Sequence, residues 1–109
     1  MSRAKGNIAE DKACKHLNGK GFIIVERNFY SRFGEIDIIA IKDDILHFVE
    51  VKSGINYESA IQNITQKKLS KLIKTADIYI NKNKLNLNYM FDAIAITPKE
   101  IFYLENITI

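Results

Sequence analysis

The chain has 109 residues and a formal net charge of +3, and 47% of its residues are hydrophobic. This length is typical of one domain with one core, so we expect residues 1–109 to form a single unit. No run approaches the ~18 apolar residues of a membrane span, and the N-terminus is polar and charged, so we expect a cytoplasmic protein that does not enter a membrane. The single cysteine, Cys14, excludes an internal disulfide and zinc sites that need several thiolates.

Hydrophobic spacing and turn residues predict a helix, three strands, a second helix and two further strands. Gly19 and Gly21 end the first helix, and Thr65 is a suitable N-cap for the second. A hairpin followed by a crossover helix and another strand requires a mixed sheet with helices packed on it. We therefore predict an α/β fold with an αβββαβ core, whose elements in chain order are residues 4–18, 22–30, 33–41, 45–53, 65–82, 89–97 and 101–104.

Positive charge is concentrated in two segments on either side of a more acidic centre. Residues 59–91 contain six lysines against one acid, Asp77. The first twenty residues contain five further basic side chains: Arg3, Lys5, Lys12, Lys15 and Lys20. This distribution suits a phosphate backbone on the flanks and a cation in the middle, although an ordinary solvated lysine face explains it equally well.

The second and third predicted strands form a hairpin that gathers carboxylates. A two-residue turn at Asp43-Asp44 would place Asp37 directly opposite Glu50, and Glu35 opposite Lys52. Two opposed carboxylates ~5 Å apart repel each other by roughly 3 kcal/mol at an effective dielectric near 20. A proton, a lysine or a divalent cation would relieve this repulsion, and carboxylate oxygens are the ligands that Mg²⁺ or Mn²⁺ prefers.

Lys52 lies two residues beyond Glu50 on the same predicted strand face. Its long side chain can reach a phosphate oxygen or a water near the cation. A divalent cation lowers the pKa of water, and a lysine stabilises the charge that grows on the phosphorane. The hairpin therefore predicts metal-assisted phosphodiester hydrolysis.

Two ionisable residues on the predicted helices fall on apolar faces. At 100° per residue, Glu10 lies within the apolar arc of the first helix, and Lys68 lies within that of the second. Lys68 is in the first turn, where free amides favour an anion, so we expect a phosphate there. Lys67 and Lys71 are expected to face away from the core and to add positive charge toward nucleic acid. A structural cluster of ion pairs with no ligand is the alternative interpretation.

At these positions the chain resembles a known family. The motifs are Gly6-x-x-Ala9-Glu10, Arg27-Asn28, Gly34-Glu35-Ile36-Asp37, Phe48-Val49-Glu50-Val51-Lys52, Thr65-x-x-Lys68 and Phe91-Asp92. This ordered set is similar to the motifs of the uncharacterised bacterial YraN-like family. That family is placed in the PD-(D/E)xK, or restriction-endonuclease-like, nuclease superfamily, which includes Holliday-junction resolvases.

The resemblance implies roles for individual residues. Asp37, Glu50 and the carbonyl of Val51 would bind the metal, and Lys52 would be the catalytic lysine. Glu10 would be the additional acid, with catalytic and metal-binding roles, of the resolvase-like branch. Ile36 replaces the proline of the superfamily name, and Met90 stands where relatives often carry an arginine before Phe91-Asp92.

Several other polar residues are assigned lesser roles. Tyr30 and Arg32 lie in an aromatic and basic segment, residues 29–33, that could clamp a splayed strand or simply border the core. Glu35 is expected to support Lys52 or the metal. Asp92 is an unusual inward acid that would either support the site, with Arg27 as a partner, or serve the fold alone. His47 is expected on the face opposite Glu50.

The sequence thus predicts a Mg²⁺- or Mn²⁺-dependent nuclease that acts on DNA, with branched or structured DNA suggested by Glu10. A homodimer would suit a symmetric substrate. The principal alternative is a non-catalytic nucleic-acid-binding or adaptor domain that keeps the nuclease fold.

Overall fold

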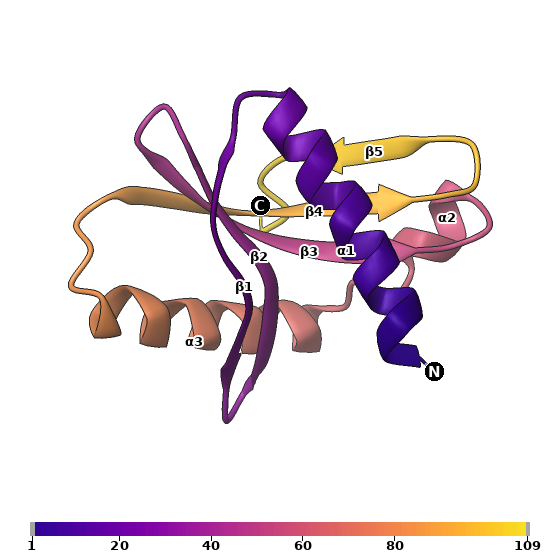
Figure 1. The fold of residues 1–109 in the computed structure, drawn as a ribbon. Coiled ribbons are helices and arrows are strands. Elements are labelled where there is room, and N and C mark those ends of the chain that lie inside the picture. The colour runs from indigo at the N-terminus through magenta and orange to yellow at the C-terminus, as the bar shows by residue number, and fades with distance from the viewer. Residues whose placement is uncertain (1, 109) are drawn as a thin grey trace.

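A computed structural model describes residues 2–108, with side chains from residue 8 onward, and shows one sheet between helices (Figure 1). The side chains of Arg3 and Lys5 in the N-terminal basic segment lie outside the described residues. The elements are α1 (Ser2–Gly19), β1 (Ile23–Ser31), β2 (Gly34–Lys42), β3 (Ile45–Ser53), α2 (Tyr57–Ile61), α3 (Gln66–Lys82), β4 (Asn88–Ile96) and β5 (Ile101–Leu104).

The five strands lie in the order β1-β2-β3-β4-β5. All neighbours are antiparallel except β3 and β4, which are parallel and joined through α2 and α3. Helix α1 crosses one face of the sheet and α3 covers the other (Figure 1). The predicted α/β fold with a mixed sheet and flanking helices is confirmed, and α2 is an element that the sequence analysis missed.

Each face of the sheet has its own apolar core. Leu17 of α1 packs with Ile38, Val49 and Ile94, and Cys14 is a buried free thiol in this group. On the other face, α3 packs against the sheet mainly through Leu72, Ala76 and Tyr79, which meet Ile39 and Phe48. Alternate strand residues therefore face different helices, as the two-residue period of a strand requires.

The caps and turns explain where the elements begin. The side chain of Thr65 accepts a hydrogen bond from Lys68 N at 3.2 Å, which confirms the predicted N-cap of α3. Asp43 and Asp44 have φ angles of 51° and 62°, the left-handed conformation that a two-residue type I′ hairpin turn needs at both positions. This turn fixes the register of β2 against β3.

The predicted register is confirmed from the turn as far as the Ile38–Val49 pair. Beyond that pair β2 continues against β1, while β3 runs on beside β4, so the two strands diverge (Figure 1). Of the two predicted pairs beyond Ile38–Val49, Asp37–Glu50 is not part of the β2–β3 ladder, and Glu35–Lys52 is wrong. Glu35 lies opposite Tyr30 on β1, and Lys52 forms its ion pair with Glu50 on its own strand.

Within residues 2–108, none of the helices combines the length and the apolar character that a bilayer crossing would need.

Candidate metal centre

Asp37 occupies the point where β2 and β3 separate. Its Oδ2 atom accepts a hydrogen bond from the backbone N–H of Val51 at 2.8 Å. In a continued ladder that N–H would bond to the backbone of β2, so the carboxylate takes the place of a strand partner. Asp37 is thereby held between the two strands by the main chain.

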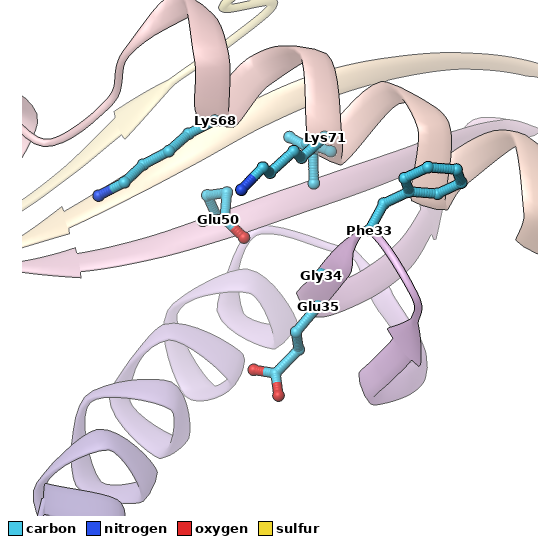
Figure 2. A pocket seen from close by; sticks show the side chains of 7 residues that line it. Phe33, Gly34, Glu35, Glu50, Lys68 and Lys71 are labelled. Atoms are coloured by element: carbon cyan, nitrogen blue, oxygen red, sulfur yellow. The ribbon is translucent and has the colours of Figure 1, made fainter.

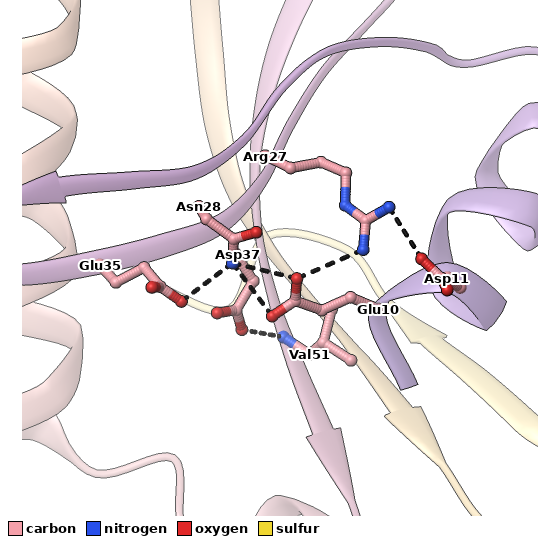
Figure 3. Close-up of polar contacts among 7 residues, drawn as sticks. All are labelled: Glu10, Asp11, Arg27, Asn28, Glu35, Asp37 and Val51. Carbon is pink, nitrogen blue, oxygen red and sulfur yellow. Dashed lines mark hydrogen bonds and ion pairs between the residues drawn. The ribbon is translucent and has the colours of Figure 1, made fainter. Parts of the chain in front are cut away.

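Glu10 from α1 and Glu35 from β2 meet Asp37 on the side of the sheet that α1 covers (Figure 3). One carboxylate oxygen of each residue lies within 4.8 Å of the others, which is close enough for one cation to bind all three. Glu10 is only 8% exposed, so the inward position predicted for it from helical spacing is confirmed.

Asn28 on β1 connects two of these acids. Its Nδ2 atom donates to Glu10 Oε1 and Oε2 at 3.0 and 3.2 Å, and to Glu35 Oε1 at 3.2 Å (Figure 3). Asn28 has a φ of 55°, a conformation that asparagine adopts more readily than most residues. The amide partly compensates the clustered negative charge, a role that the sequence analysis did not assign.

Arg27 fixes α1 beside this cluster. Its guanidinium contacts Glu10 at 3.5 Å and Asp11 at 2.9 Å. The suggested contact between Arg27 and Asp92 is therefore wrong.

Glu50 lies on β3, across the gap that opens where β2 and β3 separate, and beneath α3 (Figure 2). It lines a pocket of about 140 Å³ together with Phe33, Glu35, Lys68 and Lys71. Lys52 Nζ contacts Glu50 Oε2 at 3.6 Å, whereas the other oxygen, Oε1, is buried without a hydrogen-bond partner. A buried carboxylate oxygen without a partner is costly, and a proton or a cation would compensate it.

The electrostatics link the two sides of the gap. Burial, reinforced by the negative charge of Glu50, raises the pKa of Asp37 to about 8. Burial also raises the pKa of Glu50, and the adjacent Lys52 opposes this effect. Glu50 and Glu10 both act on Asp37, and Glu35 acts on Glu50, so the four carboxylates form one electrostatic group. Such a group favours binding a proton or a divalent cation.

The donor set fits a hard divalent cation. Glu10, Glu35 and Asp37 offer carboxylate oxygens from two elements. Glu50, predicted as a ligand, is not one of these three residues, although its buried Oε1 atom lacks a hydrogen-bond partner. Carboxylate oxygens are ligands that hard divalent cations prefer. The main chain of Val51 contributes its N–H to Asp37, and the role predicted for its carbonyl stays a prediction.

Two lysines of α3, Lys68 and Lys71, differ from their predicted orientations, whereas Lys67 is exposed as predicted. Lys68 is exposed rather than buried in the apolar arc, because the helix packs through Leu69 and Leu72, but its side chain borders the pocket above Glu50. Lys71, predicted to face away, lines the same pocket (Figure 2). Lys67 is exposed and lies outside the residues that line it.

Arg32 and Phe33 form the turn between β1 and β2. The ring of Phe33 lines the pocket and makes two cation–π contacts. Arg32 Cζ lies 4.9 Å and Lys74 Nζ lies 5.3 Å from the centroid of the ring. Tyr30 is 62% exposed on the same hairpin, opposite Glu35. Tyr30 and Arg32 were predicted to contact nucleic acid, whereas Phe33 had no separate predicted role.

Asp92 belongs to a different network, which favours the structural alternative predicted for it over a supporting role at the metal centre. Its carboxylate lies 2.5 Å from His47 Nδ1. It accepts hydrogen bonds from the hydroxyl of Tyr103 and, at 2.9 Å, from the backbone N–H of Asn106. His47 packs edge-on against Phe22, on the α1 side of the sheet and opposite Glu50, as predicted. These contacts orient Asp92 without the arginine that Met90 replaces.

Comparison with known proteins places this arrangement in a family. The sequence model of the uncharacterised protein family UPF0102 matches residues 9–96, a range that contains Glu10, Glu35, Asp37, Glu50 and Lys52. The chain belongs to the UPF0102 family. This confirms the resemblance to the YraN-like family seen in the motifs.

Several UPF0102 proteins match over nearly the whole chain. The UPF0102 protein of Sulfurimonas denitrificans is 63% identical over 100% of both chains. Those of Aliarcobacter butzleri and Wolinella succinogenes are 53% and 50% identical, over 99% and 100% of both chains respectively. Their names state no activity, so the chemistry of the UPF0102 site has to be inferred from its residues.

Proposed function

We propose that this protein is a Mg²⁺- or Mn²⁺-dependent nuclease that hydrolyses phosphodiester bonds of DNA. The observation that carries the proposal is the convergence of Asp37, Glu35 and Glu10 near Glu50. The Oε1 atom of Glu50 is buried without a partner, and its Oε2 atom lies 3.6 Å from Lys52 Nζ. The motifs that resemble the PD-(D/E)xK superfamily support the same chemistry, since they fall on these residues.

The carboxylates would hold the cation, with Asp37 in the centre because the Val51 N–H fixes its position. A bound divalent cation supplies Lewis acidity toward a phosphate and lowers the pKa of water. Asn28 keeps Glu10 and Glu35 together, so that little rearrangement is needed on binding.

Lys52 would contact the phosphate of the substrate. Its ammonium is next to Glu50 and lines a small cavity beneath α3 that shares Glu50 and Lys68 with the larger pocket. From there it would donate to a phosphate oxygen that gains charge in the transition state. Lys68 and Lys71 from α3 add positive charge at the mouth of this pocket and would bind adjacent phosphates. The resolvase-like position of Glu10 favours branched or structured DNA as a substrate.

A binding or adaptor protein that keeps this site without turnover is the second candidate function. The exposed basic side chains of α3 would bind nucleic acid whether or not it is cleaved, so they support the adaptor function as well as the nuclease function. The two candidates differ in the fate of the substrate.

The test is to incubate the purified protein with linear, flapped and four-way DNA in Mg²⁺ and in Mn²⁺, beside a Glu50→Gln variant and an EDTA control. We expect cleavage by the wild type that is lost in the variant and in EDTA. Binding without cleavage under all conditions would support the adaptor function. Equal cleavage by Glu50→Gln would show that the activity does not come from this site.

A further inference from the structure

The pocket above Glu50 is built between two elements that come from different parts of the chain. The β1–β2 turn forms one wall through Phe33, and α3 forms the other through Lys68, Lys71 and Leu72 (Figure 2). The hydroxyl of Ser31, at the base of the turn, lies 2.8 Å from that of Thr75 in α3. This contact fixes the turn relative to the helix, so the two walls are held at a set separation.

The pocket is small and its floor is recessed. Its volume of about 140 Å³ suits a phosphate group and not a whole base pair. The side chain of Glu50 at its floor is only 18% exposed. A strand whose phosphate reaches Glu50 must therefore bend into the molecule.

Cations lead from this floor to an aromatic ring. Lys68, Lys71 and Lys74 follow one another along α3 and span about 9 Å of helix axis at 1.5 Å per residue. Lys74 ends 5.3 Å from the centroid of Phe33, and Arg32 lies 4.9 Å from it. The backbone of one nucleic-acid strand could follow the lysines and bring a base to the Phe33 ring.

From this arrangement we infer that the substrate strand is unpaired where it enters the site: its phosphates follow Lys68, Lys71 and Lys74, and one base stacks on Phe33. The inference rests on the proposed function and specifies its substrate class. An unpaired base has a free face for stacking, whereas a paired base must first be flipped out at a cost of a few kcal/mol. A single strand also bends into a recess at far lower cost than a duplex.

The test measures binding separately from cleavage. The Glu50→Gln protein, which keeps Phe33 and the α3 lysines, is titrated by fluorescence anisotropy in Mg²⁺ with a labelled twelve-residue thymidine oligonucleotide. The comparison probe is the same strand annealed to its complement. We expect the single strand to bind at least 10-fold more tightly. Equal or tighter binding of the duplex would overturn the inference.

Phe33→Leu then tests the aromatic contact. We expect it to weaken single-strand binding roughly 5- to 100-fold, the range typical of base–aromatic stacking. Phe102→Leu is the matched control, because Phe102 is also a partly buried aromatic residue but contacts Tyr57 away from the pocket, and it should leave binding unchanged. Thermal melting of both variants verifies that they are folded.

A strand that lacks bases at successive positions completes the test. It should bind the Glu50→Gln protein more weakly than the intact strand does, and adding Phe33→Leu should not weaken its binding further. If Phe33→Leu weakens the abasic strand as much as the intact one, Phe33 does not stack on a base and the inference fails. Because every readout is binding, the result is independent of whether the wild type cleaves DNA.

Discussion

The N–H of Val51 on β3 donates to the carboxylate of Asp37 on β2 at 2.8 Å, at the point where the two strands separate. A side chain that replaces a backbone partner is fixed as firmly as the strands themselves. The same position also buries Asp37 beside Glu50, and both effects raise the pKa of Asp37 to about 8. Position and charge at Asp37 are therefore set by one local feature, the divergence of β2 from β3.

Asp37→Asn should stabilise the metal-free protein at pH 8. The amide oxygen still accepts the Val51 N–H, while the charge that repels Glu50 is removed. We expect a gain of about 1 kcal/mol, or roughly 4–8 °C in Tm for a domain of this size, measured by calorimetry in EDTA. A lower Tm for the variant would mean that the ionised carboxylate contributes to the fold instead of opposing it.

The stability of the metal-free protein should fall as the pH rises from about 5 to 8. The pKa values of Asp37 and Glu50 are raised in the folded state, so the folded protein binds more protons than the unfolded chain in this range. Stability is then highest below the ordinary pKa of a carboxyl and is lost as pH approaches the folded pKa of about 8.

Mg²⁺ should reverse this trend, because the cation takes the place of the protons. We expect the rise in Tm caused by saturating Mg²⁺ to grow from pH 6 to pH 8.5, as measured by thermal unfolding across the series. A rise that is the same at every pH would indicate that the cation binds to groups other than these acids.

Lys52→Met should strongly slow cleavage and leave the cation site in place. Lys52 approaches Glu50 at 3.6 Å, and the proposed role of its charge is to stabilise the phosphate in the transition state. We expect kcat to fall by about 100-fold or more, with the Mg²⁺-induced rise in Tm retained. Lys67→Met, at an exposed lysine outside the pocket, is the control for the loss of one positive charge.

Asp92→Asn should lower stability without changing the response to Mg²⁺. The fully buried carboxylate of Asp92 accepts from Tyr103 and Asn106 and contacts His47, and an amide would turn a donor toward one of these groups. We expect a loss of about 2–3 kcal/mol in urea unfolding. A variant that also loses its response to Mg²⁺ would show that this network extends to the metal centre.

Local patterns predicted much of this molecule. The Asp43-Asp44 turn and the alternating apolar residues after it were sufficient to predict the β2–β3 register down to Ile38 and Val49. The position of Glu10 followed from helical spacing alone, because a helix that packs on a sheet must direct one face inward. Thr65 was recognisable as an N-cap from its residue type.

The features that were missed depend on tertiary structure. The divergence of β2 from β3 removes the Glu35–Lys52 pair, and it arises because β2 follows β1 while β3 follows β4. The five-residue helix α2 is too short for a periodic signal, although Asn56 and Ser59 form a capping box that could have indicated it. The contact of Asn28 with both Glu10 and Glu35 needs α1, β1 and β2 in place.

The most direct test of the central claim, that these carboxylates form a divalent-cation site, is isothermal titration of the metal-free protein with Mn²⁺ at pH 8. We expect saturable binding by the wild type, its loss in Asp37→Asn, and its retention in Asp92→Asn, whose acid lies in the separate His47 network. Absence of binding by the wild type, or equal binding by Asp37→Asn, would contradict the account.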